Sequence, residues 1–142
     1  MTATFTAPEV LTDLIKGIRI AMLTTTAGDG TLRSRPMATQ EADLDGTLWF
    51  FAGRSSQVFD DLRHQSQVNV SYSDVEGMRF VSVSGRARLI EDPARMQSLW
   101  REEYLTWFPL GIGDPDLALV RVDPEAAERW SEGGHVTVTL RH

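Results

Sequence analysis

The alternation of hydrophobic and polar residues predicts a chain built mainly from short strands. Residues 18–26 are rich in isoleucine, leucine and threonine, and Gly28-Asp29-Gly30 is a turn signal that leads into a second strand over residues 31–40. A further turn at residues 43–46 precedes residues 47–52, where the apolar run is typical of a buried strand. Three antiparallel strands in succession would form a meander.

Four more segments carry strand patterns in the second half of the chain: residues 67–73, 78–90, 117–122 and 136–140. In the first of them, valine and tyrosine alternate with asparagine and serine, as expected of a strand with one buried face. Gly85 interrupts the longest segment and indicates a bulge or a bend. Pro36, in the earlier strand over residues 31–40, lacks a backbone N–H, so we expect an edge, a bulge or an opening there.

Helix signals separate some of these strands. Pro8 is favoured in a first helical turn and precedes a short helix over residues 9–16. Ser55 or Ser56 can cap a second helix that ends near His64.

A third helix is expected to begin at Asp92-Pro93, because aspartate is a good cap and proline fits the first helical position. Asp123-Pro124-Glu125 carries the same signal and predicts one further turn before Trp130. The apolar residues of the third helix lie along one stripe: Met96, Leu99, Trp100, Tyr104, Trp107 and Phe108.

Six or seven strands with two or three outer helices favour a small barrel over an open sheet, because closure removes exposed strand edges. The length of 142 residues is ordinary for one domain, so we expect a single domain over residues 1–142. No apolar run is long enough to span a bilayer, and the N-terminus lacks the basic start and apolar stretch of a signal peptide. A cytoplasmic protein with no membrane partner is therefore expected.

Charge and residue usage argue against several functions. The net charge of −6 argues against nucleic-acid binding, which requires a concentrated basic face. Without cysteine there is no disulfide, thiolate ligand or thiol nucleophile, and three scattered histidines do not indicate a zinc site. No phosphate-loop, dinucleotide or hydrolase motif is present. Redox chemistry would therefore need a bound cofactor.

The segment from Arg33 to Gln40 is the strongest candidate for a ligand site. On a strand, Arg33, Arg35 and Met37 share one face, which places two guanidinium groups beside an apolar surface. That combination suits a ligand with a phosphate at one end and a flat aromatic ring at the other. The alternative is an edge strand with two solvated arginines.

Several fragments of the sequence occur in a recognisable order and spacing: Ser34-Arg35-Pro36-Met37, residues 46–51, residues 67–72, residues 81–85 and Trp107-Phe108-Pro109. Together they resemble the general stress protein branch of the pyridoxamine 5'-phosphate oxidase-like split barrels, over about residues 10–130. The resemblance implies a mainly β fold with flanking helices, a six-stranded antiparallel split barrel that forms a homodimer. It also implies FMN as the cofactor, in the cleft between the two subunits.

The resemblance assigns candidate FMN contacts residue by residue. Arg35 and Ser56 would meet the phosphate, supported by Arg54, since a guanidinium fork and a helix N-terminus both favour an anion. The remaining candidates would line or cover the flavin: Pro36, Met37, Ala38, Phe51, Ala52, Trp107 and Trp130. Two positions depart from the family pattern, because many relatives have a threonine or serine where Ala52 stands and a phosphate-binding lysine where Val58 stands.

Two functions stay open at this point. In an FMN-dependent oxidoreductase of stress or redox metabolism, the flavin would carry the hydride or electron, and no side chain stands out as a catalytic acid or base. A non-enzymatic module with a weaker phosphate site would carry flavin, or bind haem or a deazaflavin. For Trp49 and Trp100 we expect core packing instead of a ligand. The aromatic stripe exceeds what one short helix needs for docking, which predicts a two-fold homodimer.

Overall fold

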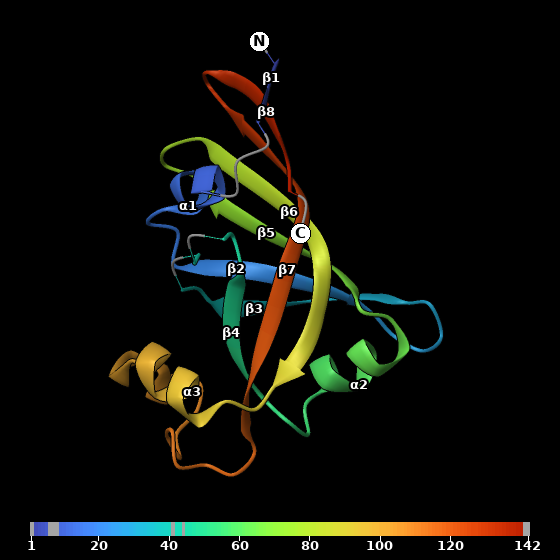
Figure 1. The fold of residues 1–142 in the computed structure, drawn as a ribbon, viewed down its shortest axis with the longest axis vertical. Helices are drawn as coiled ribbons and strands as arrows, with labels where there is room; N and C mark the ends of the chain where they lie inside the picture. Colours follow the sequence, from blue (N-terminus) through green and yellow to red (C-terminus); the bar gives the residue numbers. More distant parts are fainter. Residues whose placement is uncertain (1, 6–8, 41, 44, 141–142) are drawn as a thin grey trace.

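The computed structural model describes residues 2–5, 9–40, 42–43 and 45–140, and the fold is mainly β (Figure 1). The strands are β1 (Thr2–Phe5), β2 (Ile20–Thr26), β3 (Leu32–Ala38), β4 (Leu48–Gly53), β5 (Gln67–Asp74), β6 (Arg79–Ile90), β7 (Leu117–Ser131) and β8 (Gly134–Thr139). The helices are α1 (Glu9–Ile15), α2 (Gln57–His64), α3 (Pro93–Leu99) and the 3-10 helix η1 (Glu102–Thr106). None of the helices in the described residues is long and apolar enough to cross a membrane.

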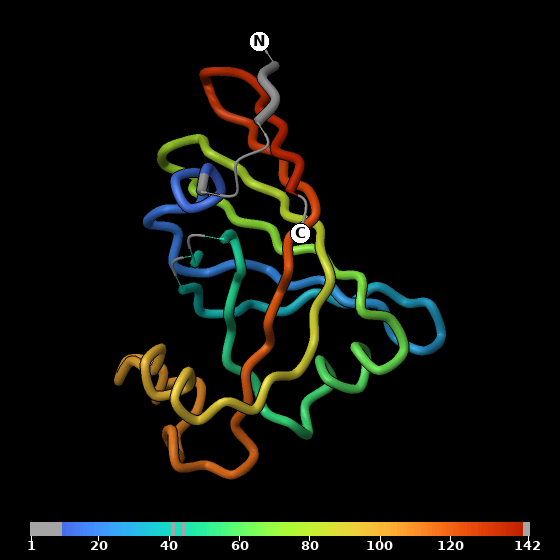
Figure 2. The backbone as a smooth tube through the Cα atoms, viewed as in Figure 1, coloured from blue at the N-terminus to red at the C-terminus, as the bar shows by residue number. Residues whose placement is uncertain are grey.

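The strands form one sheet in the order β1-β8-β7-β6-β5-β2-β3, and β4 pairs with β7 beside this path. Paired strands are antiparallel, except that β1 runs parallel to β8. The sheet curls around a core (Figure 2). Within the described residues β3 and β4 are not paired, so the sheet does not close between these two strands. The predicted mainly β fold class is confirmed, although the described residues form a sheet of eight strands in place of six.

The predicted meander is wrong at its last step. β2 pairs with β3 as predicted, but β4 does not continue the sheet beside β3 and pairs with β7 instead. A hydrophobic run indicates that a strand is buried but does not say which strand lies beside it, and here the pairing partner comes from much later in the chain. Pro36 predicted an edge, a bulge or an opening, and of these the structure shows an edge, because β3 ends the sheet order.

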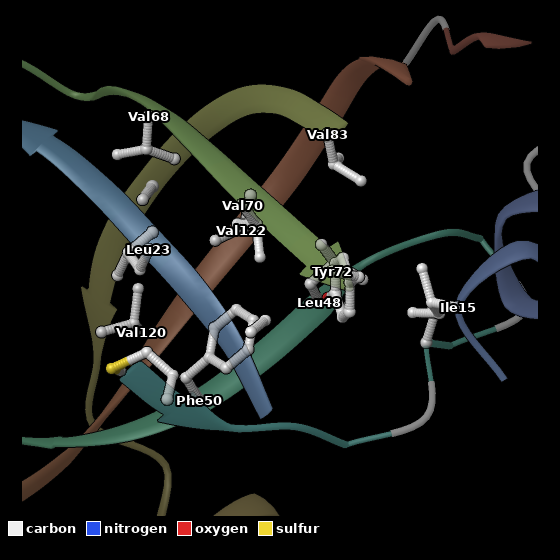
Figure 3. Close-up of a cluster of buried hydrophobic side chains, with 14 of the residues drawn as sticks. Ile15, Leu23, Leu48, Phe50, Val68, Val70, Tyr72, Val83, Val120 and Val122 are labelled. Atoms are coloured by element: carbon white, nitrogen blue, oxygen red, sulfur yellow. The ribbon is translucent and has the colours of Figure 1, made fainter. Parts of the chain in front are cut away.

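β4 carries apolar side chains on both faces and so joins two hydrophobic clusters. Leu48, Phe50 and Ala52 face the main core, where Figure 3 shows Leu48 and Phe50 among valines of β5, β6 and β7. Trp49 and Phe51 face a second cluster, together with residues of α3 and η1. The packing role predicted for Trp49 is confirmed, since this side chain is 5% exposed.

The apolar stripe predicted on the third helix is divided between two elements. α3 ends at Leu99, the backbone of Trp100 is extended, and η1 follows. This break lets the rings of Trp100 and Tyr104 converge on Phe51, at centroid distances of 5.4 and 5.8 Å, so the packing role of Trp100 is also confirmed. Most of the stripe therefore covers β4 of its own chain, and within it only Trp107 is largely exposed.

The turn predicted at residues 123–125 is wrong, because β7 continues past Pro124 as one strand. On the neighbouring β6 the pairing shifts register at Gly85, which confirms the bulge predicted there. A Cβ atom at Gly85 would collide with the backbone of Asp123 and Pro124, so glycine permits a close approach where the proline has no N–H to donate. β7 then reaches a hairpin with β8 at the end of the molecule remote from α3 (Figure 1).

Candidate functional site

A small apolar pocket lies at the opening between β3 and β4. Its volume is about 30 Å³, room for about one water molecule. Its walls come from three separate parts of the chain: Pro36, Met37, Ala38, Phe51, Tyr104, Trp107 and Phe108. The pocket thus brings the predicted flavin contacts of β3 together with Phe51 and Trp107. Sequence reasoning missed Tyr104 and Phe108 as pocket residues, although both belong to the aromatic stripe.

The pocket walls differ in exposure. Met37 and Phe51 are buried, and the Phe51 ring is fixed by the neighbouring aromatic rings of the second cluster. Trp107, by contrast, leaves 46% of its surface exposed. An exposed indole beside a rigid apolar slot offers a face against which a flat ring can stack.

Arg35 of β3 is held within the chain by three hydrogen bonds. Its Nη1 donates to the carbonyl of Leu23 at 3.2 Å and to Oγ1 of Thr25 at 2.7 Å, and its Nη2 donates to Oδ2 of Asp61 at 3.3 Å. A guanidinium has five N–H donors, so Nε–H and one Nη2–H keep no partner among the described residues. The side chain as a whole is 20% exposed. The alternative of a solvated arginine fits Arg33, which is exposed, and is wrong for Arg35.

Asp61 of α2 is the buried counter-charge of Arg35. Its Oδ2 accepts a hydrogen bond from Thr25 at 2.7 Å, and its Oδ1 accepts one from Gln57 at 3.0 Å. Burial by itself would raise the pKa of Asp61, but the hydrogen bonds from Thr25, Gln57 and Arg35 and the charge of Arg33 outweigh it, so this pKa is lowered. The carboxylate is therefore ionised at neutral pH. Sequence reasoning missed Asp61, because one carboxylate on a polar helix is typical of an exposed surface.

Ser56 stands at the N-cap of α2, and its Oγ is buried without a hydrogen-bond partner in the described residues. A serine at this position usually accepts a hydrogen bond from an N–H of the first helical turn, but here the side chain makes no such bond. A buried hydroxyl without a partner costs free energy. An anionic ligand at this helix end would satisfy both the hydroxyl and the free backbone donors.

At three other positions that the resemblance places near the flavin, the side chain faces away from the pocket. The side chains of Ala52 and Val58 pack in the main core, at 6% and 5% exposure, so Ala52 could touch a ligand only through its backbone. Arg54 forms an ion pair with Glu91 and donates from Nε to the carbonyl of Pro115 at 3.0 Å. It lines a separate cavity of about 340 Å³, so the structure does not bring it to the pocket.

Trp130 lies near the far end of β7. It pairs with Phe80 across the sheet, and its ring stacks on His135 with centroids 5.2 Å apart. Phe51, in the pocket wall, pairs with Leu119 of β7, and the strand from that point to Trp130 spans about 36 Å. Within one chain, Trp130 is therefore remote from the pocket.

Tyr104 is the ionisable residue of the pocket lining. Nε2 of Gln40 donates a hydrogen bond to the phenol oxygen at 2.5 Å, and burial raises the pKa of Tyr104 above its ordinary value. The phenol is therefore neutral at physiological pH. An apolar slot, a neutral phenol and a nearby guanidinium can bind and orient a flat molecule with an anionic tail, and none of them is set up as a strong base.

The chain matches one protein family by sequence and several solved proteins by structure. The sequence profile of a family described as pyridoxamine 5'-phosphate oxidase like matches residues 7–142. A protein related to general stress protein 26 from Clostridium acetobutylicum has a similar structure, with a TM-score of 0.77, 19% identity, and coverage of 93% of this chain and 95% of that one. The general stress FMN/FAD binding protein of Xanthomonas citri is 33% identical, with a TM-score of 0.71 and 88% of each chain covered.

A heme binding protein from Mycobacterium smegmatis also has a similar structure, with a TM-score of 0.73 at 14% identity, covering 94% of this chain and 58% of that one. No curated protein sequence matches the chain. The likenesses confirm the predicted split-barrel fold and the resemblance to the general stress protein branch.

Proposed function

This chain belongs to the pyridoxamine 5'-phosphate oxidase-like family, and from that premise we propose that it is a cytoplasmic homodimer that binds FMN. We further propose that it works as a flavin-dependent oxidoreductase in stress or redox metabolism. When bound, FMN would supply the hydride or electron transfer, and the chain would supply binding and orientation. The observation that carries the proposal is the pocket in which the end of β3 faces Phe51 and Trp107.

The residues present fit both ends of FMN. The apolar lining of the pocket would form one wall against the flat ring, and the two N–H donors of Arg35 that have no partner in the described residues suit the phosphate. Arg35 and Met37 are two positions apart on the same face of β3, about 7 Å along the strand. One FMN molecule could therefore contact Arg35 with its phosphate and Met37 with its ring. The unpartnered hydroxyl of Ser56 supports a phosphate at the start of α2.

A second candidate function is a non-enzymatic module that carries flavin or holds another planar ligand, such as haem or a deazaflavin. Two observations favour it. Asp61 neutralises Arg35, and Val58 faces the core at the position where relatives supply a lysine. Both weaken the attraction for a phosphate.

We propose that a second copy of the chain completes the site. The pocket of about 30 Å³ is far smaller than the roughly 300–1,000 Å³ of most ligand sites. Ile20 and Met22, on the outer face of β2 next to β3, are 44% and 39% exposed, and exposed apolar residues mark partner surfaces. Trp130 would reach the flavin only from the second copy.

A visible spectrum of the purified protein, followed by titration with FMN and riboflavin, tests the proposal. We expect flavin absorption that a nicotinamide reductant bleaches, and an affinity for FMN about tenfold above that for riboflavin because of the phosphate contacts. Bound flavin that no reductant bleaches would support the carrier. A colourless protein that neither flavin stabilises would exclude both the FMN enzyme and the flavin carrier.

A further inference from the structure

A groove leads away from the pocket along the start of β2 and the end of β3. It consists of two cavities of about 240 and about 270 Å³. The two cavities share the lining residues Arg19, Thr39 and Arg101. The nearer cavity also shares residues with the pocket between β3 and β4: Ala38, Tyr104 and Trp107. A molecule in the groove would therefore have one end beside the proposed flavin ring.

Cations outnumber acids along this groove. Lys16, Arg19 and Arg101 line it, together with Asp13 and Glu103. Arg101 is paired with Glu103 at 3.7 Å, whereas the side chains of Lys16 and Arg19 have no ion-pair or hydrogen-bond partner among the described residues. In a chain with a net charge of −6 this is a local excess of positive charge. Lys16 lies at the end remote from the pocket, and Arg19 lines both cavities.

The end of α1 borders the larger cavity, and its free carbonyls would repel an anion if they were uncovered. Arg79 satisfies two carbonyls at this end, because its Nη1 donates to the carbonyl of Leu14 at 3.1 Å and its Nη2 to the carbonyl of Lys16 at 2.9 Å. Arg79 thus offsets part of the negative potential of this helix end, and Asp13 on the same helix is the acidic residue that the cations must outweigh.

The walls of the groove are fixed in place. Oγ1 of Thr39 donates to the carbonyl of Ile18 at 2.5 Å. Nε2 of Gln40 donates to the carbonyl of Leu99 at 3.0 Å and also to Tyr104. These bonds join the residues after β3 to the residues before β2 and to the end of α3, so the backbone that borders the groove is held in place.

From this arrangement we infer that the groove binds a small organic anion, a carboxylate or a phosphate ester, with its flat apolar end against Trp107 and its charge between Lys16 and Arg19. The inference names the substrate class of the proposed oxidoreductase, and in that respect it rests on the proposed function. The binding itself needs only the groove and can be measured without flavin.

Isothermal titration of the full chain without added flavin, with benzoate, phenyl phosphate and benzamide as probes, tests the inference. Benzamide has the shape of benzoate without its charge, so the groove should prefer the two anions by about tenfold at low salt. High salt should reduce the preference, because both cations are exposed. Equal binding of the three probes, or no binding at millimolar concentration, would overturn the inference.

Arg19→Ala should remove most of the preference for the anions, and Arg19→Lys should retain much of it. Arg88→Ala is the matched control, because Arg88 is an exposed arginine of β6 outside both cavities. Equal losses in Arg19→Ala and Arg88→Ala would show a general effect of net charge and overturn the site. A preserved preference in a protein that binds no FMN would refute the proposed function and leave the groove standing.

Discussion

Replacing Asp61 with asparagine tests whether the buried carboxylate organises the phosphate side of the site. The substitution keeps the size of the side chain, removes the charge that faces Arg35 and turns one acceptor oxygen into a donor. The hydrogen bonds that Thr25 and Gln57 donate to the carboxylate also lose their charged partner. We therefore expect a less stable protein.

The magnitude follows from burial. Removing one partner of a fully buried ion pair costs about 3–5 kcal/mol. Asp61 is fully buried, but the side chain of Arg35 is 20% exposed and can be partly hydrated after the change. We therefore expect a loss of about 2–3 kcal/mol in the free energy of unfolding. With a urea dependence of roughly 1–3 kcal/mol per molar, the midpoint should fall by about 1 M.

Urea unfolding followed by tryptophan fluorescence measures this loss, and Asp60→Asn is the control. Asp60 is the neighbouring carboxylate of α2 and is 58% exposed. Its partners, Arg63 in an ion pair and Gln57 through an exposed hydrogen bond, lie on the same helix, so its replacement should change the stability by less than about 0.5 kcal/mol. Equal midpoints for Asp61→Asn and Asp60→Asn would refute the reasoning.

The pH dependence supplies an independent check. Because the fold lowers the pKa of Asp61 from its ordinary value of 3.8, the stabilisation is fully present above pH 3.8 and is lost as the pH falls through the lower folded value. The difference in unfolding free energy between wild type and Asp61→Asn should stay constant near neutral pH and shrink below about pH 4. A difference that widens in acid would contradict the assigned direction.

Arg35→Lys keeps a charge opposite Asp61 but loses the guanidinium fork, so a fluorescence titration should show FMN affinity falling by about tenfold with riboflavin affinity unchanged. Arg35→Ala also leaves Asp61 buried without its counter-charge, so it should lower the urea midpoint as well, and the lysine variant separates the two effects. Gly85→Ala should cost about 1–3 kcal/mol in urea unfolding, because the added methyl group meets the backbone of Asp123, and an unchanged midpoint would contradict this. Val58→Lys should destabilise the fold without tightening FMN binding, because Val58 packs in the main core, and tighter binding would place position 58 at the phosphate. Light scattering at micromolar concentration should give the mass of two chains, and a clean monomer that binds FMN would contradict the shared site.

The sequence pattern predicted correctly those elements that are stabilised by residues close to them in the chain. The alternation along β5 reports one buried face directly, and the structure keeps that alternation. Asp92 also behaves as predicted, because its side chain accepts a hydrogen bond from the backbone N–H of Arg95 at 3.1 Å. In both cases the forces that select the conformation come from residues within a few positions.

Pro124 shows where local signals fail. Asp123-Pro124-Glu125 has the composition of a helix start, yet β7 passes through it because Gly85 on β6 lets the two backbones approach there. The hydrophobic run of β4 likewise predicted a buried strand, but its pairing with β7 depends on residues about seventy positions later. Such pairings depend on tertiary contacts, which the strand and helix propensities of individual residues do not encode.

The same distinction explains which parts of the candidate site were predictable. Pro36, Met37 and Ala38 are adjacent on one strand, so a motif could identify them together, and the structure places all three in the pocket. The partner of Arg35 lies 26 positions away on α2, and no sequence pattern pairs the two. That pairing changes the chemistry of the site, because Asp61 fixes the guanidinium while cancelling much of its charge. Any phosphate selectivity must therefore come from the remaining directed N–H donors and from the start of α2, which makes geometry more decisive here than net charge.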